Sequence, residues 1–249
     1  MKQIVLFAII NLLNNYSYSQ LISSDKNWNS TPVFIDDFTP PHTPWNEIGW
    51  NDYPDLKWAS FLITAGVTHG DFEHQVYNYK NAIFNASDSS LILRADTASP
   101  AGQNITNYEI PPGYERNTAL NNMYYYSGAI NSIDFFKYGY FETRCKIPVQ
   151  AGAFPAFWLY FQDGGHYREI DIFERMTILG DGGIVSGIWM GNHHPPERVN
   201  NFYYYDSNLT GWHTWGFEWS PKRAIWYCDN KIIGSFFSDS VPQYLCKLF

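Results

Sequence analysis

Short runs of alternating apolar and polar residues recur along the second half of this chain, separated by segments rich in Asn, Asp, Gly and Pro. Runs of this kind, about 8 to 15 residues apart, are typical of β-strands joined by turns. No window keeps a 3.6-residue apolar period, so the pattern does not favour helices. The strands expected here are 129–133, 138–147, 156–161, 168–173, 183–190, 213–219, 224–228 and 231–237.

The first half of the chain has fewer strand signals. Runs at 33–35, 73–79 and 90–95 have the β-branched or alternating pattern of short strands, and Asp229-Asn230 near the other end indicates a hairpin turn. Segment 25–55 is rich in Pro, Asn and Asp, and segment 97–120 is polar and contains Pro111-Pro112-Gly113, so we expect loops in both. The pattern as a whole predicts an all-β fold, an antiparallel sandwich.

Alternation also predicts what each face of a strand carries. In 140–147, Phe141 and Ile147 share one face while Glu142 and Arg144 share the other. In 155–160, the apolar side chains again fall opposite Trp158. A face lined with aromatic and charged groups suits a polysaccharide cleft, because sugar rings stack on aromatic planes. An ordinary solvated face with scattered aromatics is the alternative.

The most informative segment is 168–174, where Glu169 and Asp171 alternate with isoleucines. Both carboxylates therefore project from one face, and strict alternation would send Glu174 into the core. An unpaired carboxylate in a core is costly, so we expect one extra residue, a β-bulge near Phe173, that returns Glu174 to the face of the other two acids.

Three acids in a row can perform glycoside hydrolysis. The α-carbons of Glu169 and Glu174 are expected about 13 Å apart, and glutamates that lean together can approach the gap of about 5 Å that retaining glycosidases need. The charge of the middle carboxylate would raise the pKa of a neighbouring acid. A calcium site and a solvated polar face are the alternatives; strand-borne ligands lack the loop wrap of calcium sites, and a bulge is costly for a decorative face.

Composition narrows the class of protein. At 249 residues the chain fits one domain, and 19% aromatic with only 16% charged residues excludes disorder and coiled coil. The net charge of -8 gives no field to attract nucleic acid or anionic lipid. We expect a monomer.

Residues 1–19 are expected to be a secretory signal peptide, because an apolar run of about ten residues follows Lys2 and precedes the small-residue pattern Ser17-Tyr18-Ser19. The run is about half of what a bilayer requires, so a membrane helix is the weaker interpretation. The mature chain, 20–249, would then be a single soluble domain, secreted or periplasmic.

Three cysteines allow at most one intramolecular disulfide, and C-x-x-C metal spacing is absent. Buried or unpaired thiols are therefore expected at Cys145, Cys228 and Cys246. We predict no cofactor and no metal.

Residues 169–174 resemble the E-x-D-x-x-E signature of glycoside hydrolase family 16, in the bulged form of laminarinases, agarases, porphyranases and carrageenases. The segment Phe34-Ile-Asp-Asp-Phe38 resembles the family's early D-E-F segment, with Asp37 in place of Glu. Further stretches that resemble the family's motifs are 126–132, 138–148, 154–159, 212–221 and 225–229. The ordered matches cover much of the chain.

The resemblance implies a β-jelly-roll of two curved antiparallel sheets with a cleft on the concave face. It implies that Glu169 is the nucleophile, Asp171 the assisting carboxylate and Glu174 the acid/base. It also implies a sugar-stacking role for Trp158 and a polar substrate contact for His213, where a core tryptophan and a structural histidine are the alternatives. Tyr167, which flanks the acidic strand, is a further candidate for substrate binding.

The expected function is that of a secreted, retaining endo-glycosidase. The acidic net charge favours β-1,3-glucan or mixed-linkage glucan as substrate. A galactan hydrolase, of the agarase, porphyranase or carrageenase kind, and a non-catalytic carbohydrate-binding protein on the same fold are the alternatives. Family sequences continue beyond the equivalent of Phe237 with another sheet strand, so the chain would lack its last strand or strands.

Overall fold

The computed structural model describes residues 4–7, 31–38, 57–59, 74–77, 79–97, 124–163, 166–175, 183–191, 197–206 and 208–249. The chain forms two compact units: Met1–Asp37 with Phe135–Phe249, and Phe38–Asp134. Two domains and two lobes of one domain would both give such a grouping, so the single catalytic domain over 20–249 stays a prediction.

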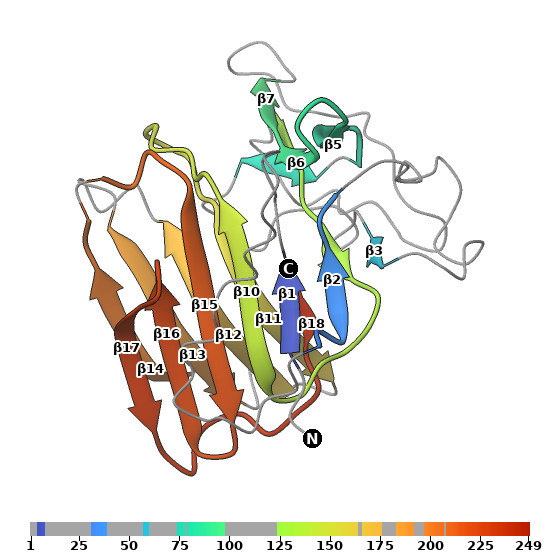
Figure 1. The fold of residues 1–249 in the computed structure, drawn as a ribbon. Coiled ribbons are helices and arrows are strands. Elements are labelled where there is room, and N and C mark those ends of the chain that lie inside the picture. The colour runs from blue at the N-terminus through green and yellow to red at the C-terminus, as the bar shows by residue number, and fades with distance from the viewer. Residues whose placement is uncertain are drawn as a thin grey trace. The chain divides into compact units, whose positions relative to one another are not determined.

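The first unit is built from two sheets that face each other (Figure 1). The six-stranded sheet has the order β17 (Lys231–Phe237), β16 (Arg223–Cys228), β15 (His213–Ser220), β10 (Gly139–Cys145), β1 (Ile4–Phe7) and β2 (Phe34–Asp36). The five-stranded sheet has the order β14 (Glu197–Tyr204), β13 (Ile184–Gly191), β12 (His166–Arg175), β11 (Ala156–Asp163) and β18 (Lys247–Leu248). All pairs within the five-stranded sheet are antiparallel.

The described residues of the second unit form three small sheets and one 3-10 turn. Their elements are β3 (Trp58–Ala59) with β9 (Asn131–Ser132); β4 (Gln75–Tyr77), β8 (Tyr125–Ser127) and β7 (Ala95–Thr97); β5 (Ala82–Asn85) with β6 (Ser90–Leu93); and η1 (Tyr79–Asn81). Asn81 holds part of this unit together, because its side-chain amide donates to the Arg94 carbonyl at 3.1 Å and to Asp96 Oδ2 at 3.0 Å.

The all-β prediction is confirmed, and each strand expected in the second half of the chain is found with small shifts of its ends. The 129–133 run is reduced to β9. The hairpin turn at Asp229-Asn230 is also confirmed, and both residues have the positive φ, 44° and 70°, that such turns require. Strand β14, which the sequence analysis did not predict, closes one edge of the five-stranded sheet.

Several expectations fall on residues outside the described part of the chain. The expected loops at 25–55 and 97–120 lie mostly there. Of the predicted signal peptide the structure describes 4–7, as β1, which pairs in parallel with β10 and β2. The signal peptide itself stays a prediction. No described helix is long and apolar enough to cross a membrane.

The core of the first unit lies between its two sheets. Ile170 and Ile172 of β12 have no more than 1% of their surface exposed, and the Phe173 ring lies 4.9 Å from that of Trp215 on β15. A hydrogen bond also crosses the interface, because Trp226 Nε1 of β16 donates to the Asp171 carbonyl at 2.8 Å. Burying a large apolar side chain of this kind stabilises a fold by roughly 1.5–3 kcal/mol.

The cysteines are unpaired. Cys145 and Cys228 lie in strands and Cys246 is buried near the C-terminal strand, and none of the three forms a disulfide. Burial raises the pKa of each thiol to about 12. The expectation of buried or unpaired thiols is therefore confirmed.

A close approach between the two sheets gives a test of this packing. A Cβ placed on Gly234 of β17 would lie 2.2 Å from the Phe202 ring of β14, and that ring packs edge-on against Trp226. We expect Gly234→Ala to lower the free energy of unfolding by about 1–3 kcal/mol, because the core would be overpacked. Urea unfolding measures the loss.

Gly183→Ala is the matched control, because the nearest atom to its Cβ would be the Tyr204 carbonyl oxygen at 3.5 Å, an ordinary contact. Its stability should change by no more than about 0.5 kcal/mol. Equal unfolding curves for the two variants would show that Phe202 does not fill this space.

Candidate active site on the five-stranded sheet

Strand β12 contains the predicted bulge. Its residue Phe173 pairs with Phe157 of β11, and the next pair along is Asp171 with Trp158, so Ile172 is an extra residue. The pairing with β13 shifts at the same place, where Ser186 Oγ donates to the Ile172 carbonyl at 2.8 Å. Ile172 and Phe173 are both buried, as the bulge prediction requires.

The bulge brings the three acids onto one face. Asp171 pairs with Trp158, and Glu174 pairs with Ala156, two residues away on the same strand. Glu169 lies two residues before Asp171 on the same face. We call this side of the five-stranded sheet, which carries Glu169, Asp171 and Glu174, the acidic face.

Asp171 is the enclosed member of the three. It has no exposed surface, and the indole Nε1 of Trp189 on β13 donates to its Oδ2 at 2.9 Å. Burial and the nearby charges of Glu169 and Glu174 raise the pKa of Asp171 well above its ordinary value, while the indole hydrogen bond lowers it. Among the described residues no group donates a hydrogen bond to its Oδ1.

Glu169 is partly exposed and has a phenol as its partner. The Tyr167 hydroxyl donates a hydrogen bond to Glu169 Oε2. Burial raises the pKa of Glu169 to about 7, and the Tyr167 hydrogen bond acts in the opposite direction. The sequence analysis expected the charge of Asp171 to raise the pKa of a neighbouring glutamate, whereas burial is what raises the pKa of Glu169. The charges of Glu169 and Glu174 raise the pKa of Asp171.

The predicted residues Trp158 and Tyr167 both lie beside the acids. Trp158 pairs with Asp171, and the Tyr167 ring meets Tyr160 edge-on at 5.2 Å. The Phe249 ring stacks on Trp158 with centroids 4.7 Å apart, and the backbones of these two residues exchange hydrogen bonds of 2.9 and 3.1 Å. Trp158 is therefore part of an aromatic group on the acidic face.

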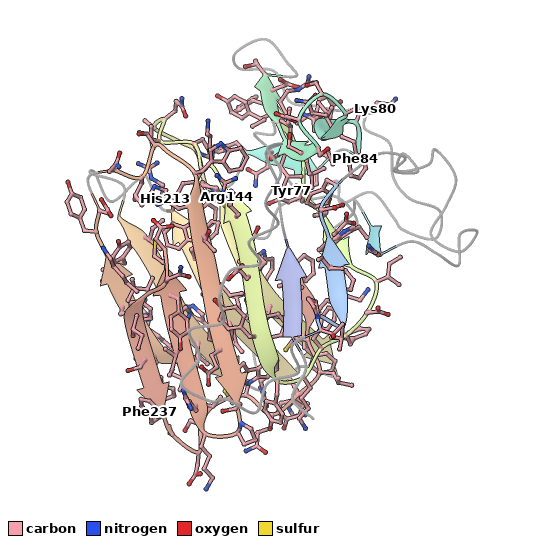
Figure 2. The ribbon with its side chains drawn as sticks, viewed as in Figure 1. Tyr77, Lys80, Phe84, Arg144, His213 and Phe237 are labelled. Carbon is pink, nitrogen blue, oxygen red and sulfur yellow. The ribbon has the colours of Figure 1, made fainter. Side chains whose placement is uncertain are left out.

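His213 has a different set of partners. Its Nδ1 lies 2.7 Å from Asp229 Oδ2, its Nε2 lies 2.8 Å from the Asn208 carbonyl, and its ring lies 6.3 Å from that of Trp215. Hydrogen bonds to Asp229 and to Asn208 raise the pKa of His213 against the effect of burial, which lowers it. Figure 2 labels His213 and Arg144 at the same end of neighbouring strands. The hydrogen-bond partners of His213, Asp229 and Asn208, are structural, and the substrate contact stays a prediction.

One group of side chains could hold a metal ion. Donor atoms of His213, Cys228 and Asp229 all lie within 4.8 Å of one another. In the structure these atoms already have hydrogen-bond partners, because both ring nitrogens of His213 and both carboxylate oxygens of Asp229 take part in hydrogen bonds. The group therefore acts as a structural network that ties β15 to the turn after β16.

Sequence reasoning missed two residues of the acidic face. Trp189 fell inside a predicted strand, but nothing in the alternation marked its indole as a partner for Asp171. Arg198 lies on β14, and its Cζ is 4.7 Å from the centroid of the Trp189 ring. The aromatic run at 202–205 was a strand signal that could have revealed β14.

The raised pKa of Glu169 has a consequence for stability. A carboxyl whose pKa rises from 4.5 to about 7 on folding favours the folded state while it is protonated, and that contribution is lost as the pH rises through 7. Glu169→Gln cannot ionise, so its stability relative to the wild type should increase by about 1–3 kcal/mol between pH 5 and pH 8. Urea unfolding at both pH values measures this.

Asp239→Asn is the control for this experiment, because Asp239 is a surface carboxylate paired with Lys222. Its stability relative to the wild type should be the same at pH 5 and pH 8. If the difference in stability between Glu169→Gln and the wild type were also independent of pH, folding would leave the pKa of the Glu169 carboxyl unchanged.

The known proteins that this chain resembles are glycanases. The endo-1,3-1,4-beta-glycanase ExsH of Rhizobium meliloti is 28% identical over 152 residues, which cover 60% of this chain and 29% of ExsH. Another endo-1,3-1,4-beta-glycanase of that organism, EglC, is 30% identical with the same coverage. The chain thus spans less than a third of the length of these relatives.

Solved structures share the fold. A structure of the endo-acting O-glycanases with which human gut bacteria initiate mucin breakdown has a TM-score of 0.60 and 22% identity, covering 77% of this chain and 72% of that one. A mixed-linkage glucan GH16 protein of Bacteroides ovatus in complex with a G4G4G3G product has a TM-score of 0.59 and 22% identity, covering 80% and 81%. This likeness confirms the predicted β-jelly-roll.

The family can be assigned from the sequence profile. The profile described as "Glycosyl hydrolases family 16" matches residues 73–244, more than half of the chain. The match contains the whole of β12, with the bulge and the three acids that the structure places on one face. The chain belongs to family 16 of the glycosyl hydrolases.

Proposed function

We propose that this chain is a retaining endo-glycosidase that cleaves a β-linked polysaccharide on the acidic face. The observation that carries the proposal is the bulge in β12, which places Glu169, Asp171 and Glu174 on one side of a strand whose other side is core. Glu169 and Glu174 are partly exposed while Asp171 is enclosed, so the outer two carboxyls can reach a substrate.

The two outer carboxyls would divide the chemistry. Glu169 attacks the anomeric carbon and forms a glycosyl ester while Glu174 gives its proton to the leaving oxygen. Glu174, now a carboxylate, then takes a proton from water as the water attacks the same carbon, and Glu169 is released. This order restores both residues to their starting states.

Asp171 would assist without contacting bulk water. Its Oδ2 is held by the Trp189 indole, and its Oδ1 is directed into a buried site where no described group donates to it. A carboxyl that is fixed between two others in this way can exchange a proton or a hydrogen bond with Glu169 as that residue changes charge. Asp171 therefore supports the nucleophile.

The relatives suggest the polymer. ExsH and EglC are named as endo-1,3-1,4-beta-glycanases, and the Bacteroides ovatus structure holds a product of mixed-linkage glucan. We propose a β-linked glucan or galactan as the substrate. The predicted signal peptide makes secretion part of the same proposal.

Product release from laminarin, lichenan, agarose and carrageenan tests the hydrolase. We expect the wild type to release oligosaccharides from at least one polymer, and Glu169→Gln to lose at least about a thousandfold in kcat while it still binds that polymer, because the amide cannot form the ester intermediate. Asp239→Asn serves as the active control. Binding without turnover by the folded wild type would favour a non-catalytic carbohydrate-binding protein.

The pH profile tests the assigned nucleophile. Glu169 must be ionised to attack, so kcat/KM should rise as the pH passes through the pKa of Glu169. The Tyr167 hydroxyl lowers that pKa. Tyr167→Phe should therefore move the acidic limb of the profile to higher pH.

Tyr205→Phe is the matched control, because Tyr205 is 60% exposed. Its pH profile should coincide with that of the wild type. An unmoved acidic limb in Tyr167→Phe would assign the limb to a group other than Glu169.

A further inference from the structure

The row of side chains that crosses the acidic face at Glu169 ends in an arginine. Glu169 of β12 pairs with Trp189 of β13, and Trp189 pairs with Arg198 of β14. The Arg198 guanidinium lies over the Trp189 ring, with Cζ 4.7 Å from the centroid, and the indole of that ring donates to Asp171 at 2.9 Å. A single aromatic ring therefore lies between the Arg198 guanidinium and the Asp171 carboxylate.

A second bulge directs Arg198 to this face. Ile188 pairs with Asn200 and Trp189 pairs with Arg198, so Val199 is an extra residue in β14. With strict alternation Arg198 would share the side of Phe202, whose ring packs at 5.1 Å against Trp226 in the core. The bulge turns Arg198 away from the core and over Trp189.

Among the described residues, the charge of Arg198 has one partner, the Trp189 ring. The other arginines of this sheet have structural partners: Arg168 donates to the carbonyls of Tyr167 and Gly191, and Arg175 donates to that of Pro148. Arg198 is exposed, and within the described part of the chain no carboxylate forms an ion pair with it. Its five donors are available to a ligand.

The opposite end of the same row is also a cationic residue. Lys247 of β18 pairs with Tyr160 of β11, which in turn pairs with Glu169. The neighbour of Lys247, Leu248, is fully buried, so Lys247 lies on the opposite side of the strand, the acidic face. Within this row of described residues, the carboxyl of Glu169 therefore lies between two cationic residues, Arg198 and Lys247.

The geometry of Arg198 favours an anion over a hydroxyl group. The Arg198 guanidinium lies over the Trp189 ring and is exposed, and its planar fork of N–H groups matches the paired oxygens of a carboxylate or a sulfate. Charge-assisted hydrogen bonds of this kind are about twice as strong as those to a neutral hydroxyl.

We propose that Arg198 binds an anionic substituent, a sulfate ester or a carboxylate, on a sugar ring next to the ring that is held at Glu169 and Glu174. This inference rests on the proposed function, and it deepens it by naming the substrate class as an anionic glycan. The local charge of the acidic face determines whether an anionic or a neutral substrate binds, because the substrate contacts this face directly. The net charge of the chain acts at a distance and is screened by salt.

Binding, measured separately from turnover, tests this inference. The full chain with Glu169→Gln is titrated with carrageenan, with the same carrageenan after chemical desulfation, with laminarin, and with laminarin oxidised to carry carboxylates. We expect one anionic polymer to bind at least about tenfold more tightly than its neutral form, and the pair that shows the difference identifies sulfate or carboxylate. Adding Arg198→Gln should abolish the difference.

Two further variants make the result specific. Lys231→Gln removes the same charge from an exposed position on β17 of the other sheet and should leave the preference unchanged. Arg198→Lys keeps the charge without the planar fork and should keep only part of the preference. Equal affinity for charged and neutral polymers, an equal loss on both in Arg198→Gln, or no binding to any of the four would overturn the inference.

Failure of this inference and failure of the proposed function are distinguishable. Oligosaccharide release from laminarin by the wild type, without any preference for a charged polymer, would leave the hydrolase standing and remove the role of Arg198. A preference for an anionic polymer that depends on Arg198, without product release, would support the role of Arg198 and remove the hydrolase.

Discussion

Strand β12 must bury one side against the six-stranded sheet while it keeps three carboxylates out of the core, and its period of two cannot satisfy both demands over 169–174. The extra residue Ile172 resolves the conflict, because it lets Ile172 and Phe173 both face the core and returns Glu174 to the side of Asp171. Two of the contacts between the sheets lie next to this residue, that of the Phe173 ring with Trp215 and that of the Trp226 indole with the Asp171 carbonyl. The core and the candidate site are thus set by one irregularity.

The same device is used again in β14, and together the two bulges give the acidic face its distribution of charge. Enclosure raises the pKa of the Asp171 carboxyl, and the indole of Trp189 partly offsets this effect. That indole also carries the guanidinium of Arg198 on its ring. Trp189 therefore links the buried Asp171 to the exposed Arg198. The distribution of charge on the acidic face thus depends on a side chain that has no charge of its own.

Much of this arrangement could be predicted from the sequence, because it follows from local alternation. Isoleucines between acids, followed by an acid out of phase, predicted both the bulge and the common face of Glu169, Asp171 and Glu174. The positions of Trp189 and Arg198 could not be predicted in this way, because they depend on the register between β12, β13 and β14. Phe249 reaches Trp158 only through the pairing of a two-residue strand, which has no periodic signal. Register is a property of tertiary structure, and one residue of shift reverses every face.

Five tryptophans of the first unit fall into two environments, and this division gives the protein an internal spectroscopic reporter. Trp215, Trp219 and Trp226 have no exposed surface and lie in the core, where their emission depends on whether the sandwich is folded. Trp158 and Trp189 lie on the acidic face, where a polysaccharide would change the surroundings of their rings. Trp189 also touches both a carboxylate and a guanidinium, groups that influence indole fluorescence when they move. An unlabelled sample therefore carries separate optical signals for the integrity of the fold and for the occupation of its face.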